Sequence, residues 1–281
     1  MKGSYYVLND NDKEAIEYHK KTFLEIDNIG IDILDSVLNK NDKIENYWIP
    51  IRSILYRLLE FNDTLNIMVQ NSLINTAFPI LRSEFEIFIQ MLFLLKNPNE
   101  IEKKALLYHY CDIRRMNDYL EKEELDEFLF KHEYLLDIHQ EYMKSPLIDK
   151  NNWYSIYEKK KFSFKSLCAS VGKQDYYNRI YSHLSADTHS TGCIELNTIF
   201  EPEDNKYYLL NFRSFERNDT LMIYHIDFFR NVFLSITNHF DTEQRIKAAA
   251  NDFYYRAESY INCYLTLKSS CLFDPTSRYS I

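Results

Sequence analysis

The chain has 281 residues and a net charge of −9, and its composition is 46% hydrophobic and 27% charged. Such a chain can bury a sizeable core and is too apolar for a disordered protein. The acidic charge argues against general adhesion to nucleic acids. Only four glycines and six prolines occur, which argues against an all-β fold with its many turns. The sequence contains neither a P-loop motif nor the glycine-rich motif of dinucleotide-binding folds.

The cysteines and the apolar segments indicate a cytoplasmic protein. The five cysteines form no C-x-x-C pair, so neither a zinc ribbon nor a redox motif is supported, and we expect reduced thiols. His183, Asp187 and His189 do not match the spacing of a metal motif. We therefore expect no metal and no cofactor. The N-terminal residues lack the apolar core of a signal peptide, and the most apolar window, Phe78–Leu95, contains three charges and Pro79. We interpret this window as a buried helix and expect no membrane partner.

Helical periodicity covers most of the chain. Gly30 lies inside the first predicted helix and indicates a kink or a close approach of another helix. Residues 151–173 are predicted to form a looser connection, with one or two helical turns around Phe164–Val171. Two short apolar stretches that flank EPEDN predict a hairpin within 194–212. In chain order, the predicted helices are about 9–40, 45–70, 71–95, 100–120, 123–143 and 176–189, a helix from about 216, and 242–268.

These elements predict an all-α fold, a multi-helix bundle with one small β-hairpin insertion near 194–212. The scarcity of linker-like stretches favours a single domain over 1–281. We expect its characteristic motifs to lie within 45–193 and the C-terminal helices of 214–268 to pack on that part.

Two charged runs interrupt the apolar pattern. Residues 117–141 contain nine acidic side chains, and residues 155–180 contain six basic ones. The usual explanation for both runs is a solvated surface. The alternative is that the basic run contacts an RNA backbone, whose phosphates attract ammonium and guanidinium groups. The candidate RNA-binding residues are Lys159, Lys160, Lys161 and Arg179.

The apolar helix predicted at Phe78–Leu95 carries Arg82, Glu84 and Glu86. Arg82 and Glu86 are one turn apart, so they can form an ion pair within the helix. Such a pair contributes only a few tenths of a kcal/mol on an exposed face, about 0.3–0.5 kcal/mol. Here the neighbouring side chains are apolar, so we expect at least one of the charges to point into the bundle, where it needs a partner.

A second polar stripe lies in the helix predicted at Tyr176–His189. Tyr181, Ser185 and His189 follow one another at four-residue spacing, which places them on one side of a helix. Buried polar groups cost about 1–3 kcal/mol when they are left without partners. We therefore predict that Arg82 or Glu86 lies within hydrogen-bond distance of one residue of this stripe.

The two stripes resemble a known bacterial family. L-R-S-E-F-E at 81–86, with LLKNP soon after it, and Y-S-H-L-S-A-D-T-H at 181–189 are similar to the helical family called domain of unknown function 5677. The signature of that family joins an R-S-x-x-E helix to a Y-x-x-L-S-x-x-x-H helix. The resemblance spans about 45–193. It singles out Arg82, Glu86, Tyr181, Ser185 and His189.

More distantly, the chain resembles the helical HEPN group, many of whose members are metal-independent ribonucleases of toxin and antiphage systems, commonly dimeric. Those enzymes carry an R-x(4–6)-H motif, from which this sequence departs. The intervening residues number three in Arg179–His183, seven in Arg217–His225 and eight in Arg230–His239. An arginine from another helix, Arg82 or Arg179, could supply the same charge through space.

These resemblances imply a HEPN-like protein of a bacterial stress or antiphage-defence system that cleaves RNA and forms a homo-oligomer or binds a partner protein. His189 would be the general acid or base, and Arg82 would stabilise charge on the phosphate. Two alternatives remain at this stage. The cluster could belong to a non-catalytic binding or assembly module, or it could be a purely structural network. The candidate catalytic residues are His189, Arg82, Glu86, Tyr181 and Ser185.

Overall fold

The structure is a computed structural model, and it describes residues 10–39, 46–116, 127, 130, 132–144, 152–181, 198–201, 206–209, 218–240 and 242–271. This part of the chain is dominated by helices, so the prediction of an all-α, multi-helix fold is confirmed. Within it, no helix combines the length and the apolarity that are needed to cross a membrane.

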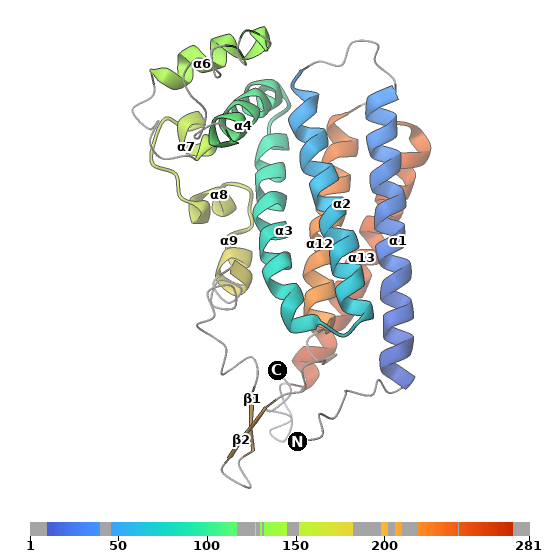
Figure 1. The fold of residues 1–281 in the computed structure, drawn as a ribbon. Helices are drawn as coiled ribbons and strands as arrows, with labels where there is room; N and C mark the ends of the chain where they lie inside the picture. The colour runs from blue at the N-terminus through green and yellow to red at the C-terminus, as the bar shows by residue number, and fades with distance from the viewer. Residues whose placement is uncertain are drawn as a thin grey trace.

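Five long helices lie side by side and form the main bundle (Figure 1). Helix α12 has a central place in it, because it contacts α1, α3 and α13. The rings of Phe88 and Phe228 stack between α3 and α12 with their centroids 4.7 Å apart, and both side chains are fully buried. The bundle helices are α1 (Asp10–Asn39), α2 (Trp48–Gln70), α3 (Ile74–Leu95), α12 (Asn218–His239) and α13 (Gln244–Cys271).

Shorter helices cover the outer side of α3 (Figure 1). Helix α8 and the π-helical turn η4 contact α3 directly, while α7 and α6 contact α4. Their bounds are η1 (Pro98–Glu100), α4 (Ile101–Met116), η2 (Glu133–Leu135), α6 (Leu136–Met143), α7 (Trp153–Tyr157), α8 (Phe164–Ser170), α9 (Gln174–Tyr176) and η4 (Tyr177–Tyr181).

The connection predicted over 151–173 is more regular than expected. Helix α8 falls where one or two helical turns are predicted, but α7 is not predicted, and the expectation of a loose connection is wrong there. The helix predicted from Tyr176 is described only as far as Tyr181, and the rest of it lies outside the described residues. Two short strands, β1 (Thr198–Glu201) and β2 (Lys206–Leu209), pair antiparallel within the stretch 194–212.

Gly30 lies at a close approach of α1 and α2. A Cβ atom at this position would lie 2.5 Å from Cδ2 of Leu59 on α2. Helix α1 continues through Gly30. Of the two explanations for Gly30, a kink or a close approach of another helix, the structure therefore shows the close approach.

Three helices end in the same hydrogen-bonded motif, in which the residue after the C-cap has a left-handed backbone. These residues are Ser72 (φ 58°), Lys159 (φ 53°) and Gly172 (φ 73°). Glycine adopts this conformation without strain, whereas a residue with a Cβ atom costs about 1–2 kcal/mol there. Two of the three ends are therefore strained. The closing bonds run from Leu73 N to Met68 O (2.9 Å), from Lys160 N to Ser155 O (3.2 Å) and from Lys173 N to Cys168 O (2.8 Å).

A polar network with a fully buried centre joins α1, α2, α3 and α12. Glu84 on α3 lies 2.9 Å from Nδ1 of His225 on α12, and the other ring nitrogen, Nε2, lies 2.8 Å from Oδ1 of Asn62 on α2. The Asn62 amide nitrogen donates to the Phe23 carbonyl at 3.0 Å and to Asp27 at 2.7 Å, both on α1. Glu84, Asn62 and His225 are all inaccessible to solvent.

The hydrogen bonds of Asn62 determine how the network is protonated. Its nitrogen uses both hydrogens on α1, so its Oδ1 must accept from Nε2–H of His225. Glu84 and Nδ1 of His225 then share one proton. Burial raises the pKa of the Glu84 carboxyl, while His225 opposes that shift.

The raised pKa of Glu84 predicts a pH dependence of stability. The folded protein holds this proton more tightly than the unfolded chain, whose carboxyl has an ordinary pKa of 4.5. The contribution is complete below that pH and is lost as the pH rises through the folded-state value. Glu84→Gln cannot ionise, so its free energy of unfolding should fall less than that of the wild type between pH 4.5 and neutrality. Urea unfolding over a pH series measures this difference, and parallel profiles would contradict it.

Candidate functional site

Arg82 and Tyr181 are 99 residues apart in sequence and meet where η4 lies against α3. Nη2 of Arg82 donates a hydrogen bond of 3.0 Å to the Tyr181 hydroxyl and lies 3.1 Å from Oε1 of Glu86. The guanidinium carbon lies 4.8 Å from the centroid of the tyrosine ring. The contact predicted between the two polar stripes is therefore confirmed.

The helical period of α3 separates its three charges. Glu84 points into the bundle toward α12, whereas Arg82 and Glu86 share the side that faces η4. The Arg82 side chain is only 17% exposed, and that of Glu86 is 38% exposed. The Glu86 carboxylate therefore contacts both the mostly buried guanidinium of Arg82 and the solvent.

Aromatic rings surround the Tyr181 side of this cluster. The Tyr181 ring stacks on Tyr177 with a centroid distance of 5.1 Å, and Phe164 and Phe85 lie 4.9 and 6.3 Å away. These rings pack around the phenol against which the guanidinium lies, whereas the Glu86 carboxylate remains 38% exposed. Solvent therefore still screens the ion pair on the Glu86 side.

The protonation state of Tyr181 follows from the same surroundings. Burial raises the pKa of its hydroxyl, Arg82 lowers it through the hydrogen bond, and the Glu86 carboxylate raises it. The phenol therefore stays neutral at neutral pH. It accepts from Arg82 and keeps its own proton to donate.

One N–H group of the Arg82 guanidinium makes no hydrogen bond to the described residues. Its Nε is buried and has no hydrogen-bond partner among the described residues. An unsatisfied buried donor costs about 1–3 kcal/mol. Ser185 and His189, the other two residues of the predicted stripe, lie outside the described residues.

The predicted RNA-binding residues are not part of this cluster. Lys159, Lys160, Lys161 and Arg179 are all exposed. Lys160 lies 3.5 Å from Glu158 and over the Phe162 ring. Lys159 lines a pocket next to Phe93, which is 11 positions beyond Arg82 on α3 and hence roughly 16 Å away along the helix axis.

A pocket of about 420 Å³ lies on the other side of Glu86. Its lining comes from α2, α3, α4 and α7, which no local pattern in the sequence brings together. Trp153 donates to Oε1 of Gln90 at 2.8 Å and fixes this wall. Gln90 follows Glu86 by one helical turn, and this spacing is the signal that could have identified it. The lining residues are Arg57, Phe61, Ile80, Ser83, Glu86, Ile87, Gln90, Tyr108, Cys111, Asp112, Arg115 and Trp153.

A buried carboxylate on α12 holds the segment that carries Tyr181. Asp227 accepts a hydrogen bond of 2.5 Å from the Tyr176 hydroxyl and one of 2.6 Å from Nε of Arg230, and Lys173 lies 3.4 Å away. Tyr176 immediately precedes η4, so Asp227 fixes where η4 begins. In the sequence, Asp227 could have been identified because it is a carboxylate within a mostly apolar helix, as Glu84 is.

No group of three or more His, Cys, Asp or Glu side chains that could hold a metal ion occurs in the part of the chain that the structure describes. His183, Asp187 and His189 are not in that part. The chemistry of the described cluster is therefore that of a guanidinium, a carboxylate and a neutral phenol.

The family model of a family of unknown function (DUF5677) matches residues 49–207. The chain belongs to this family. The match begins in α2 and ends in β2, so it contains both sides of the contact between Arg82 and Tyr181. Comparison with the curated proteins and with the solved structures finds no match.

The hydrogen bond between Arg82 and Tyr181 can be measured in this DUF5677 member by a double-mutant cycle. Tyr181→Phe keeps the ring and removes the hydroxyl, so it should lower the free energy of unfolding by about 0.5–1.5 kcal/mol. In an Arg82→Met background the same change should cost less, with a coupling energy of at least about 0.5 kcal/mol.

The exposed Tyr255 supplies the matched control. Tyr255→Phe should change the free energy of unfolding by less than about 0.5 kcal/mol in either background. Additive effects of the Tyr181 and Arg82 substitutions in urea unfolding would show that the two side chains are not coupled.

Proposed function

We propose that this protein is a HEPN-like member of a bacterial stress or antiphage-defence system that cleaves RNA without a metal ion. One observation carries the proposal. The guanidinium of Arg82 lies against the Tyr181 hydroxyl and retains a buried donor, Nε, without a partner among the described residues. Tyr181 precedes Ser185 by four residues and His189 by eight in the sequence.

In the proposed reaction, the 2′-hydroxyl of the RNA attacks the neighbouring phosphorus atom and the bond to the 5′-oxygen breaks. His189 takes the proton of the 2′-hydroxyl or protonates the leaving oxygen, and water exchanges the other proton. Arg82 stabilises the negative charge that develops on the phosphate. Ser185 and the neutral hydroxyl of Tyr181 orient the phosphate by hydrogen bonds.

Glu86 has a supporting role in this reaction. Its carboxylate holds the guanidinium of Arg82 at 3.1 Å and, being 38% exposed, borders the solvent from which RNA would approach. Loss of Glu86 would leave the guanidinium free to rotate away from Tyr181. Lys159, Lys160 and Lys161 follow α7 and would contact the RNA backbone away from the reacting phosphate, whereas Arg179 lies on η4, two residues before Tyr181, and would contact it closer by.

The second candidate is a non-catalytic binding or assembly module of such a defence system. The ion pair between Arg82 and Glu86 favours it, because a neutralised guanidinium attracts a phosphate less strongly. In that case the cluster fixes η4 on α3, and the surface binds a second copy of the chain or another protein of the system.

The RNA-cleavage proposal is tested with purified protein, a fluorescently labelled single-stranded RNA and EDTA in the buffer. The wild type should cleave the RNA, and His189→Ala should lower the rate by roughly 10²–10⁴-fold with little change in melting temperature, since general acid–base groups contribute about that much. Arg82→Lys should also lower the rate, because an ammonium cannot reproduce the geometry of the guanidinium.

His239→Ala is the matched control, because His239 lies at the end of α12 and bonds only the Ser235 carbonyl in the described part of the chain. Its rate should equal that of the wild type. A wild-type protein that leaves RNA intact, together with a His189→Ala variant that melts at a lower temperature, would contradict cleavage and favour the assembly module. Sedimentation analysis would then determine whether the chain forms a homodimer.

A further inference from the structure

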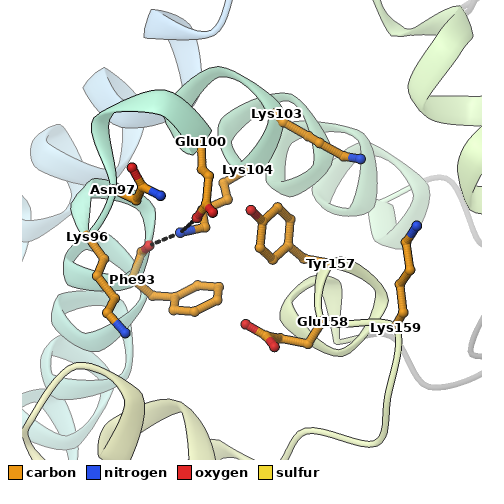
Figure 2. A pocket seen from close by; sticks show the side chains of 9 residues that line it. All are labelled: Phe93, Lys96, Asn97, Glu100, Lys103, Lys104, Tyr157, Glu158 and Lys159. Atoms are coloured by element: carbon orange, nitrogen blue, oxygen red, sulfur yellow. Dashed lines mark hydrogen bonds and ion pairs between the residues drawn. The ribbon is translucent and has the colours of Figure 1, made fainter.

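A pocket of about 680 Å³ opens between the C-terminal end of α3, the turn η1 and the C-terminal end of α7 (Figure 2). This volume is typical of sites that hold small molecules. Neither resemblance nor the proposed cleavage site accounts for it, since it lies several turns of α3 away from Arg82. Its lining residues are Phe93, Lys96, Asn97, Glu100, Lys103, Lys104, Tyr157, Glu158 and Lys159.

The pocket is positively charged in an acidic protein. Four lysines and two glutamates line it, so its formal charge is +2, whereas the chain has a net charge of −9. Both glutamates are already paired, Glu100 with Lys104 at 2.8 Å and Glu158 with Lys160 at 3.5 Å. Unneutralised ammonium groups around a cavity attract an anion.

Two of these lysines have no carboxylate partner in the described part of the chain. Among the described residues, neither Lys96 nor Lys159 lies within ion-pair distance of a carboxylate. Figure 2 shows Lys96 on one side of the pocket and Lys103 and Lys159 on the other. Lys103 is paired with Glu141 at 2.9 Å, but about half of each side chain is exposed, so this pair is weak. Ammonium groups on both sides suit an elongated ligand with several negative charges.

A buried lysine forms the back wall of the pocket. Lys104 is 1% exposed, and its ammonium donates to the Phe93 carbonyl at 3.1 Å and to Glu100 at 2.8 Å (Figure 2). It also lies 4.5 Å from the ring centroid of Phe93 and 5.1 Å from that of Tyr157. Buried charges require fixed partners of this kind. The wall is therefore rigid and preorganised.

Tyr157 is the aromatic surface of the pocket. Burial and a hydrogen bond with Glu100 raise the pKa of its hydroxyl to about 12, so the phenol remains neutral. Its ring is only partly covered and lies among the lysines in Figure 2. A planar ring of a ligand can pack against such a surface.

Lys159 lines the pocket from a position with a strained backbone. With φ at 53° it occupies the position after a helix C-cap, where α8 has Gly172. Strained non-glycine residues concentrate at binding and catalytic sites. Glycine would be unstrained at position 159 but has no side chain, whereas the lysine that occupies this position lines the pocket.

From these observations we propose that the pocket binds a small molecule with a phosphate chain, of the class of nucleoside di- and triphosphates. Lys96, Lys103 and Lys159 contact the phosphates, which lysine binds as a point charge. The N-terminal end of α4, next to Asn97 and Glu100, adds the positive end of a helix dipole. Tyr157 packs against the base.

The test is isothermal titration calorimetry of the full chain with ATP, and its key variant is Lys159→Gly. Glycine relieves the left-handed backbone, so the melting temperature should stay the same or rise. The same substitution removes one ammonium group, so the affinity for ATP should fall about tenfold, as expected for a lost bond to a charged group. Lys96→Ala should weaken binding to a similar extent.

Lys161→Ala is the matched control. It removes the same charge two residues further on, at an exposed position that does not line the pocket, and should change the affinity by less than about twofold. Absence of ATP binding by the wild type at millimolar concentrations overturns the proposal. Equal weakening by Lys159→Gly and Lys161→Ala overturns it as well, because it would show attraction to general surface charge.

Discussion

The buried network of Glu84, His225 and Asn62 fixes the arrangement of the bundle. Its hydrogen bonds join four helices, and each group has its partner on a different helix. A slide of one helix by a single residue would break these bonds among side chains that are inaccessible to solvent, at about 1–3 kcal/mol for each unsatisfied group. Apolar packing alone tolerates such slides far better, because it has no direction. The network therefore sets the register in which α3 presents its other side.

That other side carries Arg82 and Glu86, so one helix serves two purposes. Glu84 is anchored to α12, and the helical period then places Arg82 toward η4, where the Tyr181 hydroxyl meets it. Asp227 on the same helix α12 holds Tyr176, the residue before η4. Both partners of the candidate site are consequently positioned by α12, one through His225 and the other through Asp227.

Features of the fold and the site that depend on local patterns can be predicted from the sequence. The helical class follows from periodicity, and the contact between Arg82 and Tyr181 follows because both stretches carry polar groups among apolar ones. The partner of Glu84 cannot be predicted in this way, because His225 lies 141 positions away and other polar residues are equally available. Helix α7 has five residues, too few for a period. The left-handed backbone of Lys159 leaves no trace in the sequence, because glycine is the residue that signals it.

The place of α12 has a consequence for the boundaries of the functional unit. The family match ends at residue 207, whereas α12 begins at Asn218. A fragment cut to the matched region would contain Arg82, Glu86 and Tyr181 but neither His225 nor Asp227. Glu84 would then be exposed to water on an apolar helix, and Tyr176 would lose its acceptor. The smallest piece of this chain that can keep the candidate site assembled is thus larger than the region that defines the family.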